Sequence, residues 1–266
     1  MISVSEAFEN CRRQNQKALI PYLTAGFPDD ELFVVLLKEF VKAGADLLEI
    51  GIPFSDPVAD GKSIQYSSQK ALENGITIEK TFQLLQAFEE RHRIPLILMS
   101  YYNPIFAYGI SRFARQAKKM GVSGLIIPDL IPEEGKSVER LCQRNGLDLI
   151  YLLAPTSTPP RRQMIIQRSR GFVYLVSVTG VTGERERLPS SLNSWIRQVK
   201  KKSRLPVCVG FGISNPQQAQ SIASVADGVI VGSAIIEIIR NQSSPKVIIE
   251  KTKEFIHQLK ERMNGE

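Results

Sequence analysis

Short apolar runs recur along the whole chain, separated by longer segments in which apolar residues repeat every three to four positions. Runs that are apolar at consecutive positions, instead of at alternating ones, are typical of strands in a parallel sheet covered on both faces. The longer periodic segments predict amphipathic helices. In one of them Asp29 or Asp30 offers an N-cap, and Gly44 offers a C-terminal stop. Strands are predicted near residues 18–23, 46–51, 96–100, 124–128, 149–153, 172–177, 206–210 and 228–232.

Predicted strands and helices alternate, which indicates successive βα units and a parallel sheet. We therefore expect an α/β fold, a closed (β/α)8 TIM barrel, with a doubly wound open sheet as the alternative. An extra N-terminal helix precedes the first strand, and a C-terminal helix within 245–266 should pack outside the barrel. The second connection should hold two helices, near 62–74 and 78–92. Because no low-complexity linker divides the chain, we expect one domain, 1–266.

Composition narrows the class of protein. The chain is 43% hydrophobic and 23% charged, as in ordinary globular proteins. No apolar run reaches the roughly 18 residues of a membrane span, and residues 1–17 lack the apolar centre of a signal peptide, so we expect a cytoplasmic location and no membrane contact. The net charge of +7 is spread over helix faces, which argues against nucleic-acid binding and suits an anionic substrate. The three cysteines form no CxxC pair, so neither a disulfide framework nor a zinc site is indicated.

A carboxylate in an apolar strand is the first candidate for chemistry. Glu49 stands near the end of the second predicted strand, and Asp60 follows in the adjoining loop. Active sites of (β/α)8 barrels lie at the carboxyl ends of the strands, so both groups can address one ligand. Burial raises the pKa of a carboxyl group and suits it to acid or base work, whereas a partner in a polar loop stays ionised. The alternative is that Glu49 pairs with a basic group and that Asp56 and Asp60 are turn residues.

Glycine-bearing loops follow the seventh and eighth predicted strands, at 210–214 and 231–234. These are the usual phosphate-binding positions of the barrel, where glycine backbone and a helix start can approach an anion closely. A further glycine loop, 179–189, follows the sixth strand. Tight turns alone would also explain such glycines. The loops nevertheless favour a phosphorylated substrate.

Residue types that are absent from the predicted strand ends exclude several kinds of catalytic mechanism. Only His92 and His257 are present, both away from strand ends, so a histidine metal site or base is not expected. No predicted strand carries an interior lysine, which argues against Schiff-base chemistry. Asp129 is another strand-end carboxylate that can orient a ligand or a loop. Aromatic residues near strand ends can line a flat apolar pocket or pack the barrel: Tyr22, Tyr101, Tyr102 and Tyr174.

Taken together, these residues resemble the tryptophan synthase alpha subunit family, over about 4–262. The most specific motif is E-x-G-x-P-F-S-D-P-x-A-D-G, from Glu49 to Gly61. The other matching segments are PYLTAGFPD, YYNPIFAYGI, GLIIPDLIPEE, YLVSVTGVTGER, VGFGISNPQQ and GVIVGSAII.

The resemblance implies a TIM-barrel lyase that cleaves indole-3-glycerol phosphate to indole and glyceraldehyde 3-phosphate, with no cofactor or metal in this chain. It also implies an alpha2beta2 complex with a beta subunit that carries pyridoxal phosphate and receives the indole. By the same resemblance, Glu49 is the acid/base group and Asp60 faces the indole nitrogen. The substrate-binding positions are Tyr22, Tyr101, Tyr174, Thr182, Gly183, Phe211, Gly212, Gly232 and Ser233. The positions that contact the partner are Pro53, Phe54, Asp56 and Pro57.

Two departures and two alternatives remain. Lys62 and Ser63 replace the family's usual Pro and Thr, and Lys62 brings a cation close in sequence to Asp60. Position 22 is Tyr where Phe is frequent. Another phosphate-binding barrel enzyme, such as an isomerase or synthase of phosphoribosyl compounds, would share the glycine loops but not the pairing of Glu49 with Asp60. A non-catalytic subunit that only activates a beta partner is the alternative from another class.

Overall fold

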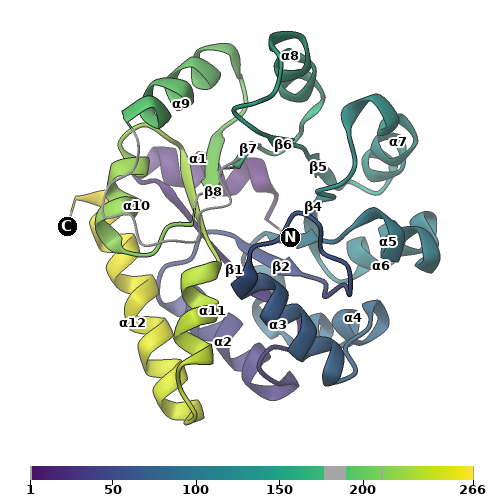
Figure 1. The fold of residues 1–266 in the computed structure, drawn as a ribbon, viewed down its shortest axis with the longest axis vertical. Coiled ribbons are helices and arrows are strands. Elements are labelled where there is room, and N and C mark those ends of the chain that lie inside the picture. Colours follow the sequence, from purple (N-terminus) through teal and green to yellow (C-terminus); the bar gives the residue numbers. More distant parts are fainter. Residues whose placement is uncertain (1, 177–189, 211, 266) are drawn as a thin grey trace.

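A parallel sheet forms the centre of the molecule and helices surround it (Figure 1). The computed structural model describes residues 2–176, 190–210 and 212–265. All described strand pairs are parallel, so their carboxyl ends gather at one rim. The strands are β1 Ala18–Thr24, β2 Leu48–Gly51, β3 Leu96–Met99, β4 Val122–Ile126, β5 Asp148–Ile150, β6 Leu152–Leu153, β7 Val173–Val176, β8 Val207–Gly210 and β9 Gly228–Val231.

The sheet closes into a barrel because its two end strands, β5 and β6, follow each other directly along the chain. Its strand order is β5-β4-β3-β2-β1-β9-β8-β7-β6, and the two end strands are separated only by Tyr151. The fifth predicted strand is therefore split in two, with β5 paired to β4 and β6 paired to β7. Tyr151 is buried and its hydroxyl donates to Glu139 Oε1 at 2.7 Å. Apart from this split, the predicted (β/α)8 barrel is confirmed.

Helices cover the outside of the barrel in the order that the periodicity predicts. A buried Phe88 leaves helical geometry, so the helix expected over 78–92 ends at Ala87 and a short 3-10 turn follows. The α-helices are α1 Val4–Arg13, α2 Asp30–Lys42, α3 Lys62–Glu73, α4 Ile78–Ala87, α5 Tyr102–Tyr108, α6 Ile110–Lys119, α7 Lys136–Arg144, α8 Pro159–Arg168, α9 Ser190–Lys202, α10 Pro216–Ala223, α11 Ser233–Arg240 and α12 Pro245–Asn264; the 3-10 turns are η1 Glu89–His92 and η2 Pro132–Glu134.

Two apolar clusters divide the interior. Strand residues alternate between them, as in β1, where Ile20 points into the barrel and Leu19 points toward the helices. The inner cluster also contains Val4 and Phe8 of α1, so the predicted N-terminal helix is confirmed and packs with the barrel interior. Asp29 caps α2 through the Leu32 N–H, and Gly44 follows the helix with φ +104°.

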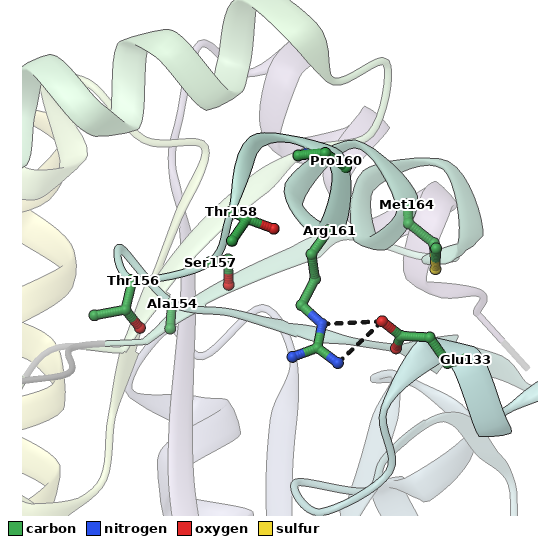
Figure 2. A pocket seen from close by; sticks show the side chains of 8 residues that line it. All are labelled: Glu133, Ala154, Thr156, Ser157, Thr158, Pro160, Arg161 and Met164. Carbon is green, nitrogen blue, oxygen red and sulfur yellow. Dashed lines mark hydrogen bonds and ion pairs between the residues drawn. The ribbon is translucent and has the colours of Figure 1, made fainter.

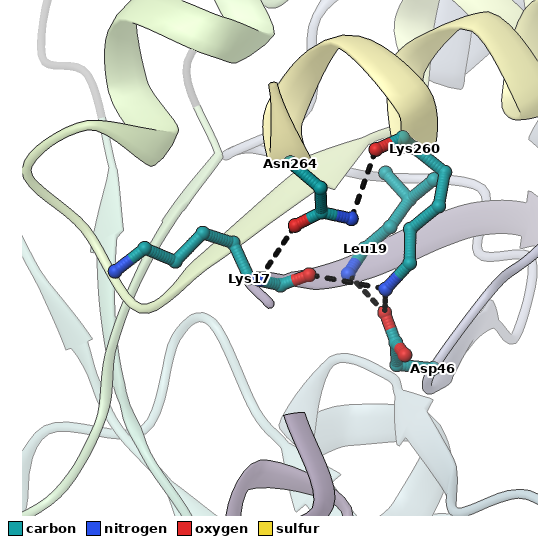
Figure 3. A network of polar contacts seen from close by, with 5 residues as sticks. All are labelled: Lys17, Leu19, Asp46, Lys260 and Asn264. Atoms are coloured by element: carbon teal, nitrogen blue, oxygen red, sulfur yellow. Dashed lines mark hydrogen bonds and ion pairs between the residues drawn. The ribbon is translucent and has the colours of Figure 1, made fainter. Parts of the chain in front are cut away.

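A polar network holds the C-terminal helix against the starts of β1 and β2 (Figure 3). Asp46 Oδ2 accepts from the Leu19 N–H and from Lys260 Nζ, each at 2.7 Å. Lys260 also donates to the Lys17 carbonyl at 3.2 Å, and Asn264 Oδ1 accepts from the Lys17 N–H at 2.9 Å. The final helix therefore packs outside the barrel as predicted, through ties to the strand ends opposite the carboxyl rim.

Candidate active site

Glu49 lies inside the barrel near the carboxyl end of β2, where its side chain is 1% exposed. It is the register partner of Tyr22 on β1 and of Ile97 on β3. Its Oε2 is buried without a hydrogen-bond partner among the described atoms. Burial, followed by the negative charge of Asp60, raises the pKa of Glu49 to about 8. The carboxyl is therefore mostly protonated at neutral pH, and within the described residues no basic group contributes to the shift of its pKa, so this part of the chain does not support the alternative of a basic partner.

Asp60 lies in the loop after β2, and Tyr101 anchors that loop. The Tyr101 hydroxyl accepts from the Ala59 N–H at 3.0 Å and is hydrogen-bonded to the Asp60 carboxylate. Burial raises the pKa of Asp60 to about 6, and the hydrogen bond from Tyr101 opposes that rise. At neutral pH the site thus presents an un-ionised Glu49 beside a largely ionised Asp60, two carboxyl groups with pKa values that their surroundings drive apart.

The predicted aromatic residues Tyr22 and Tyr174 line the inside of the barrel beside Glu49. A Cβ on Gly51 would overlap the Tyr22 hydroxyl, and a Cβ on Gly210 would overlap the Tyr174 hydroxyl. Glycine at these strand ends therefore makes room for the two phenol groups. Burial and then neighbouring carboxylates raise the pKa of both tyrosines well above the usual value, so they remain neutral hydrogen-bonding groups.

Three further apolar residues at strand ends belong to the site but were not predicted from the sequence. Met99, Leu152 and Val176 pack against the inner cluster but are only partly buried, unlike most strand residues. They lie at or near the carboxyl ends of β3, β6 and β7, where an inward side chain reaches the barrel mouth. The sequence feature that could have identified them is an inward-facing position at the carboxyl end of a strand. Recognising it requires the strand register, which the sequence does not give. Together with Tyr22 and Tyr174 they form an apolar wall suited to a flat ring.

The glycine loops after β8 and β9 differ in how far their backbone is covered: Gly212 is open, whereas Gly232 packs against the Tyr22 side chain. Gly212 has φ +50°, and a Cβ there would meet no atom of the described residues within 4 Å. Gly232 is the N-cap of α11 and Ser233 is its first residue, with no side-chain cap on the helix. In contrast, Asn215 caps the neighbouring α10 through the Gln218 N–H. The free N–H groups of α11 are therefore available to an anion. The predicted positions Thr182, Gly183 and Phe211 lie outside the described residues, as does the rest of 179–189.

The four predicted partner-contact residues differ in accessibility. Pro53 is buried, Phe54 and Pro57 are half-buried, and Asp56 is exposed. The Phe54 ring lies 5.4 Å from the Tyr101 ring, so this segment is packed directly onto the anchor of Asp60. Large apolar side chains are exposed after three consecutive strands: Val58 at 85% in the loop after β2, Phe106 at 63% within α5 after β3, and Ile131 at 37% between β4 and η2.

Two other groups occupy the same rim. Asp129 Oδ1 accepts from the Tyr102 N–H at 2.8 Å, so this carboxylate orients the start of α5 beside Tyr101, the loop-orienting role considered from the sequence. Lys62 begins α3 with an exposed side chain, and Ser63 is buried.

A separate hollow of about 530 Å³ opens between η2 and the start of α8 (Figure 2). Arg161 crosses it to Glu133, with nitrogen–oxygen distances of 2.9 and 3.1 Å. Of the predicted catalytic and substrate-binding residues that the structure describes, none lines this hollow. The hollow is therefore a surface depression apart from the described residues of the candidate active site.

The match to a known family decides the identity of the barrel. Residues 8–264 match the family described as tryptophan synthase alpha chain. The chain belongs to this family. It is 45% identical to the tryptophan synthase alpha chain of Dehalococcoides mccartyi, over 99% of this chain and 100% of the relative. With that of Geotalea uraniireducens it shares 46% identity over 90% and 89% of the two chains. The protein is accordingly a lyase of tryptophan biosynthesis, as the motifs predict.

Solved structures give the same result for the fold. Tryptophan synthase subunit alpha from Legionella pneumophila strain Paris superposes with a TM-score of 0.90 at 37% identity, covering 100% of both chains. A ligand-free tryptophan synthase structure from M. tuberculosis gives 0.87 at 34% identity, over 98% of both chains. Within the described part of the chain, no helix has the length and apolarity to cross a membrane.

The raised pKa of Glu49 predicts how stability depends on pH. Its pKa is higher in the folded than in the unfolded chain, so its contribution is fully present below the unfolded pKa and is lost as pH rises toward about 8. This loss amounts to at most about 1.4 kcal/mol per pH unit. Between about pH 5 and pH 8, Glu49→Gln should therefore lose stability less steeply than the wild type, because glutamine does not ionise. Urea unfolding across this range tests the prediction, and equal slopes for the two proteins would contradict it.

Proposed function

We propose that the Glu49–Asp60 pair cleaves indole-3-glycerol phosphate to indole and glyceraldehyde 3-phosphate. The observation that carries this proposal is a mostly neutral Glu49 carboxyl, whose Oε2 has no hydrogen-bond partner among the described residues, beside a more acidic Asp60 in an apolar barrel mouth. An aldol-type cleavage needs a place for the electrons of the breaking bond. Protonation of the indole ring at C3 gives an indolenine whose nitrogen accepts them.

Glu49 supplies the proton in this scheme. Its pKa of about 8 leaves a proton to donate near neutral pH, and the carboxylate so formed can take the proton of the glycerol hydroxyl as the carbon–carbon bond breaks. Proton removal at that hydroxyl leaves the aldehyde, and the bond electrons return to the ring to give indole. One residue thus acts first as acid and then as base.

Asp60 stabilises the positive charge that develops at the ring nitrogen. Tyr101 holds it in place by binding both the carboxylate and the preceding Ala59 N–H. A fixed negative charge in a buried site acts more strongly than in water and needs no reorganisation during the reaction. This role requires Asp60 to be ionised, which its lower pKa allows.

The phosphate group would occupy the loops after β8 and β9. Gly212 leaves open space, and α11 offers uncapped N–H groups at Gly232 and Ser233. The apolar wall of Met99, Leu152 and Tyr174 would hold the indole between these loops and Glu49. Thr182, Gly183 and Phe211 are proposed to complete the phosphate-binding loops, on the family resemblance.

We further propose that the carboxyl rim docks a beta subunit that carries pyridoxal phosphate, in an alpha2beta2 complex. Val58 in the loop after β2, Phe106 in α5 and Ile131 before η2 expose apolar surface, and Asp56 is exposed in the same loop as Val58. The Phe54 ring packs against the ring of Tyr101, which anchors Asp60. A partner that contacts Phe54 can therefore shift the position of Asp60. A partner bound here can close the site against water and receive indole directly.

An indole-release assay tests both parts of the proposal. The chain alone should cleave indole-3-glycerol phosphate slowly, and its cognate beta subunit should raise the rate by at least about tenfold, a barrier change of roughly 1.4 kcal/mol. Asp56→Ala should reduce this gain, whereas Glu9→Ala in α1 should not. A chain that releases no indole with or without the partner would be a non-catalytic activator, and a high rate indifferent to the partner would indicate a stand-alone lyase.

A further inference from the structure

Three buried hydroxyl groups form a chain from the barrel mouth to helix α3. The Tyr22 hydroxyl lies 3.3 Å from Thr24 Oγ1, which lies 2.6 Å from Ser67 Oγ. Ser67 Oγ donates in turn to the Ile64 carbonyl oxygen at 2.9 Å. Tyr22 is 6% exposed and the other two side chains are 0% exposed, so bulk water does not compete for these bonds.

One choice, the acceptor of the Ser67 proton, sets the direction of the other protons in this chain. A carbonyl oxygen only accepts, and each hydroxyl has a single proton to donate. The two hydroxyl–hydroxyl contacts each allow either atom to donate; with the Ser67 proton placed on the Ile64 carbonyl, Ser67 accepts from Thr24. Thr24 then has no proton left for Tyr22 and accepts from it. The Tyr22 proton consequently points along the chain, and its oxygen offers only lone pairs to the site.

Tyr22 stands directly beside the acid residue. It is the register partner of Glu49, and its hydroxyl lies over Gly51, two positions further along the same face of β2. Within the described residues, the titratable groups that interact with Glu49 come from four places: Tyr22 on β1, Asp60 in the loop after β2, Tyr174 on β7 and Cys208 on β8. None of these four groups brings a positive charge. A proton donated by Tyr22 would therefore be a strong stabiliser of the ionised form of Glu49.

We propose that Thr24 and Ser67 are positioning residues that keep the Tyr22 proton away from Glu49 and so hold the Glu49 carboxyl in its proton-bearing form. A hydrogen bond donated to a carboxylate favours the charged form and lowers the pKa of the group. Because the hydroxyl chain binds the Tyr22 proton, Tyr22 donates no hydrogen bond to Glu49. The effect of burial, which raises the Glu49 pKa, is then not opposed by such a bond. The catalytic meaning of this inference rests on the proposed function, but the direction of the hydrogen bonds does not.

Thr24→Val is the direct test, because valine keeps the branched shape of the buried side chain and removes the acceptor of the Tyr22 proton. The buried phenol should then turn its proton to the neighbouring carboxylates, since an unmet donor is costly. We expect the Glu49 pKa to fall by about one unit or more. Infrared titration of the ¹³C-labelled glutamate carboxyl groups in the free protein measures it, with Glu49→Gln identifying the band. The alkaline limb of indole release should move down by the same amount, and Thr24→Ser should restore both.

A double-mutant cycle separates this role from a general packing effect. In a Tyr22→Phe background, Thr24→Val should leave the Glu49 pKa where Tyr22→Phe alone puts it, because no phenol proton remains to be redirected. Ser67→Ala provides a second route if Thr24→Val does not fold. It frees the Thr24 proton to turn toward Tyr22, which reverses the chain and should lower the Glu49 pKa as well.

Two results would overturn the inference: an unchanged Glu49 pKa in both Thr24→Val and Ser67→Ala, or a fall that persists without the Tyr22 hydroxyl. Neither depends on turnover. An inactive but titrating protein would therefore count against the proposed function and leave the hydroxyl chain intact.

Discussion

Glu49→Gln should lower the rate of indole release by at least about 100-fold, the usual contribution of a positioned general acid and base. Glutamine keeps the shape and the neutral charge of the protonated carboxyl, but it can neither donate nor accept the proton in transit. Because the substituted residue is already un-ionised near neutral pH, the charge of the resting site barely changes. The loss should therefore appear in kcat with little change in the affinity for a phosphate-bearing indole analogue.

Single-turnover cleavage and calorimetric binding of indolepropanol phosphate separate these two quantities. Glu31→Gln, which alters an exposed glutamate in the first turn of α2, is a matched control and should match the wild type. A Glu49→Gln protein that cleaves substrate within a few-fold of the wild-type rate would remove Glu49 from the chemistry. Parallel losses of rate and analogue affinity would instead indicate a distorted pocket.

Gly212→Asp should weaken binding of indolepropanol phosphate strongly while affecting free indole much less. The glycine backbone has φ +50° and opens onto empty space, where the phosphate is proposed to lie. An aspartate there places a negative charge against the anion. Repulsion between unit charges at about 4 Å is roughly 4 kcal/mol at the effective dielectric of a protein surface, enough to lower affinity by more than about 100-fold.

Gly212→Asn is the matched control, since asparagine has nearly the same shape and tolerates the same left-handed backbone without the charge. Asparagine should cost the phosphate analogue far less affinity than aspartate, and the difference should shrink as salt screens the charges. Equal affinities for the analogue in wild type and Gly212→Asp would show that the phosphate does not bind at this loop.

Local pattern was sufficient for most of the architecture. Consecutive apolar runs such as that in β1 predict buried parallel strands because both faces of such a strand are covered, and the order of the runs predicts the barrel. The cap at Asp29 and the stop at Gly44 follow from backbone chemistry within a few residues. The split of the fifth strand at Tyr151 was not predictable, because it depends on which neighbour each half pairs with.

For the candidate site as well, some features were predictable from the sequence and others were not. The sequence by itself determined the family, the presence of a carboxylate in an apolar strand and the glycine loops, since these are properties of residue type and spacing. Only the tertiary structure decided that Glu49 Oε2 has no hydrogen-bond partner among the described residues, that Tyr101 anchors Asp60, and that the hydroxyl groups of Tyr22, Thr24 and Ser67 lie in one chain. Hydrogen-bond direction and pKa depend on atoms brought together from distant parts of the chain, and packing across the barrel mouth sets those distances.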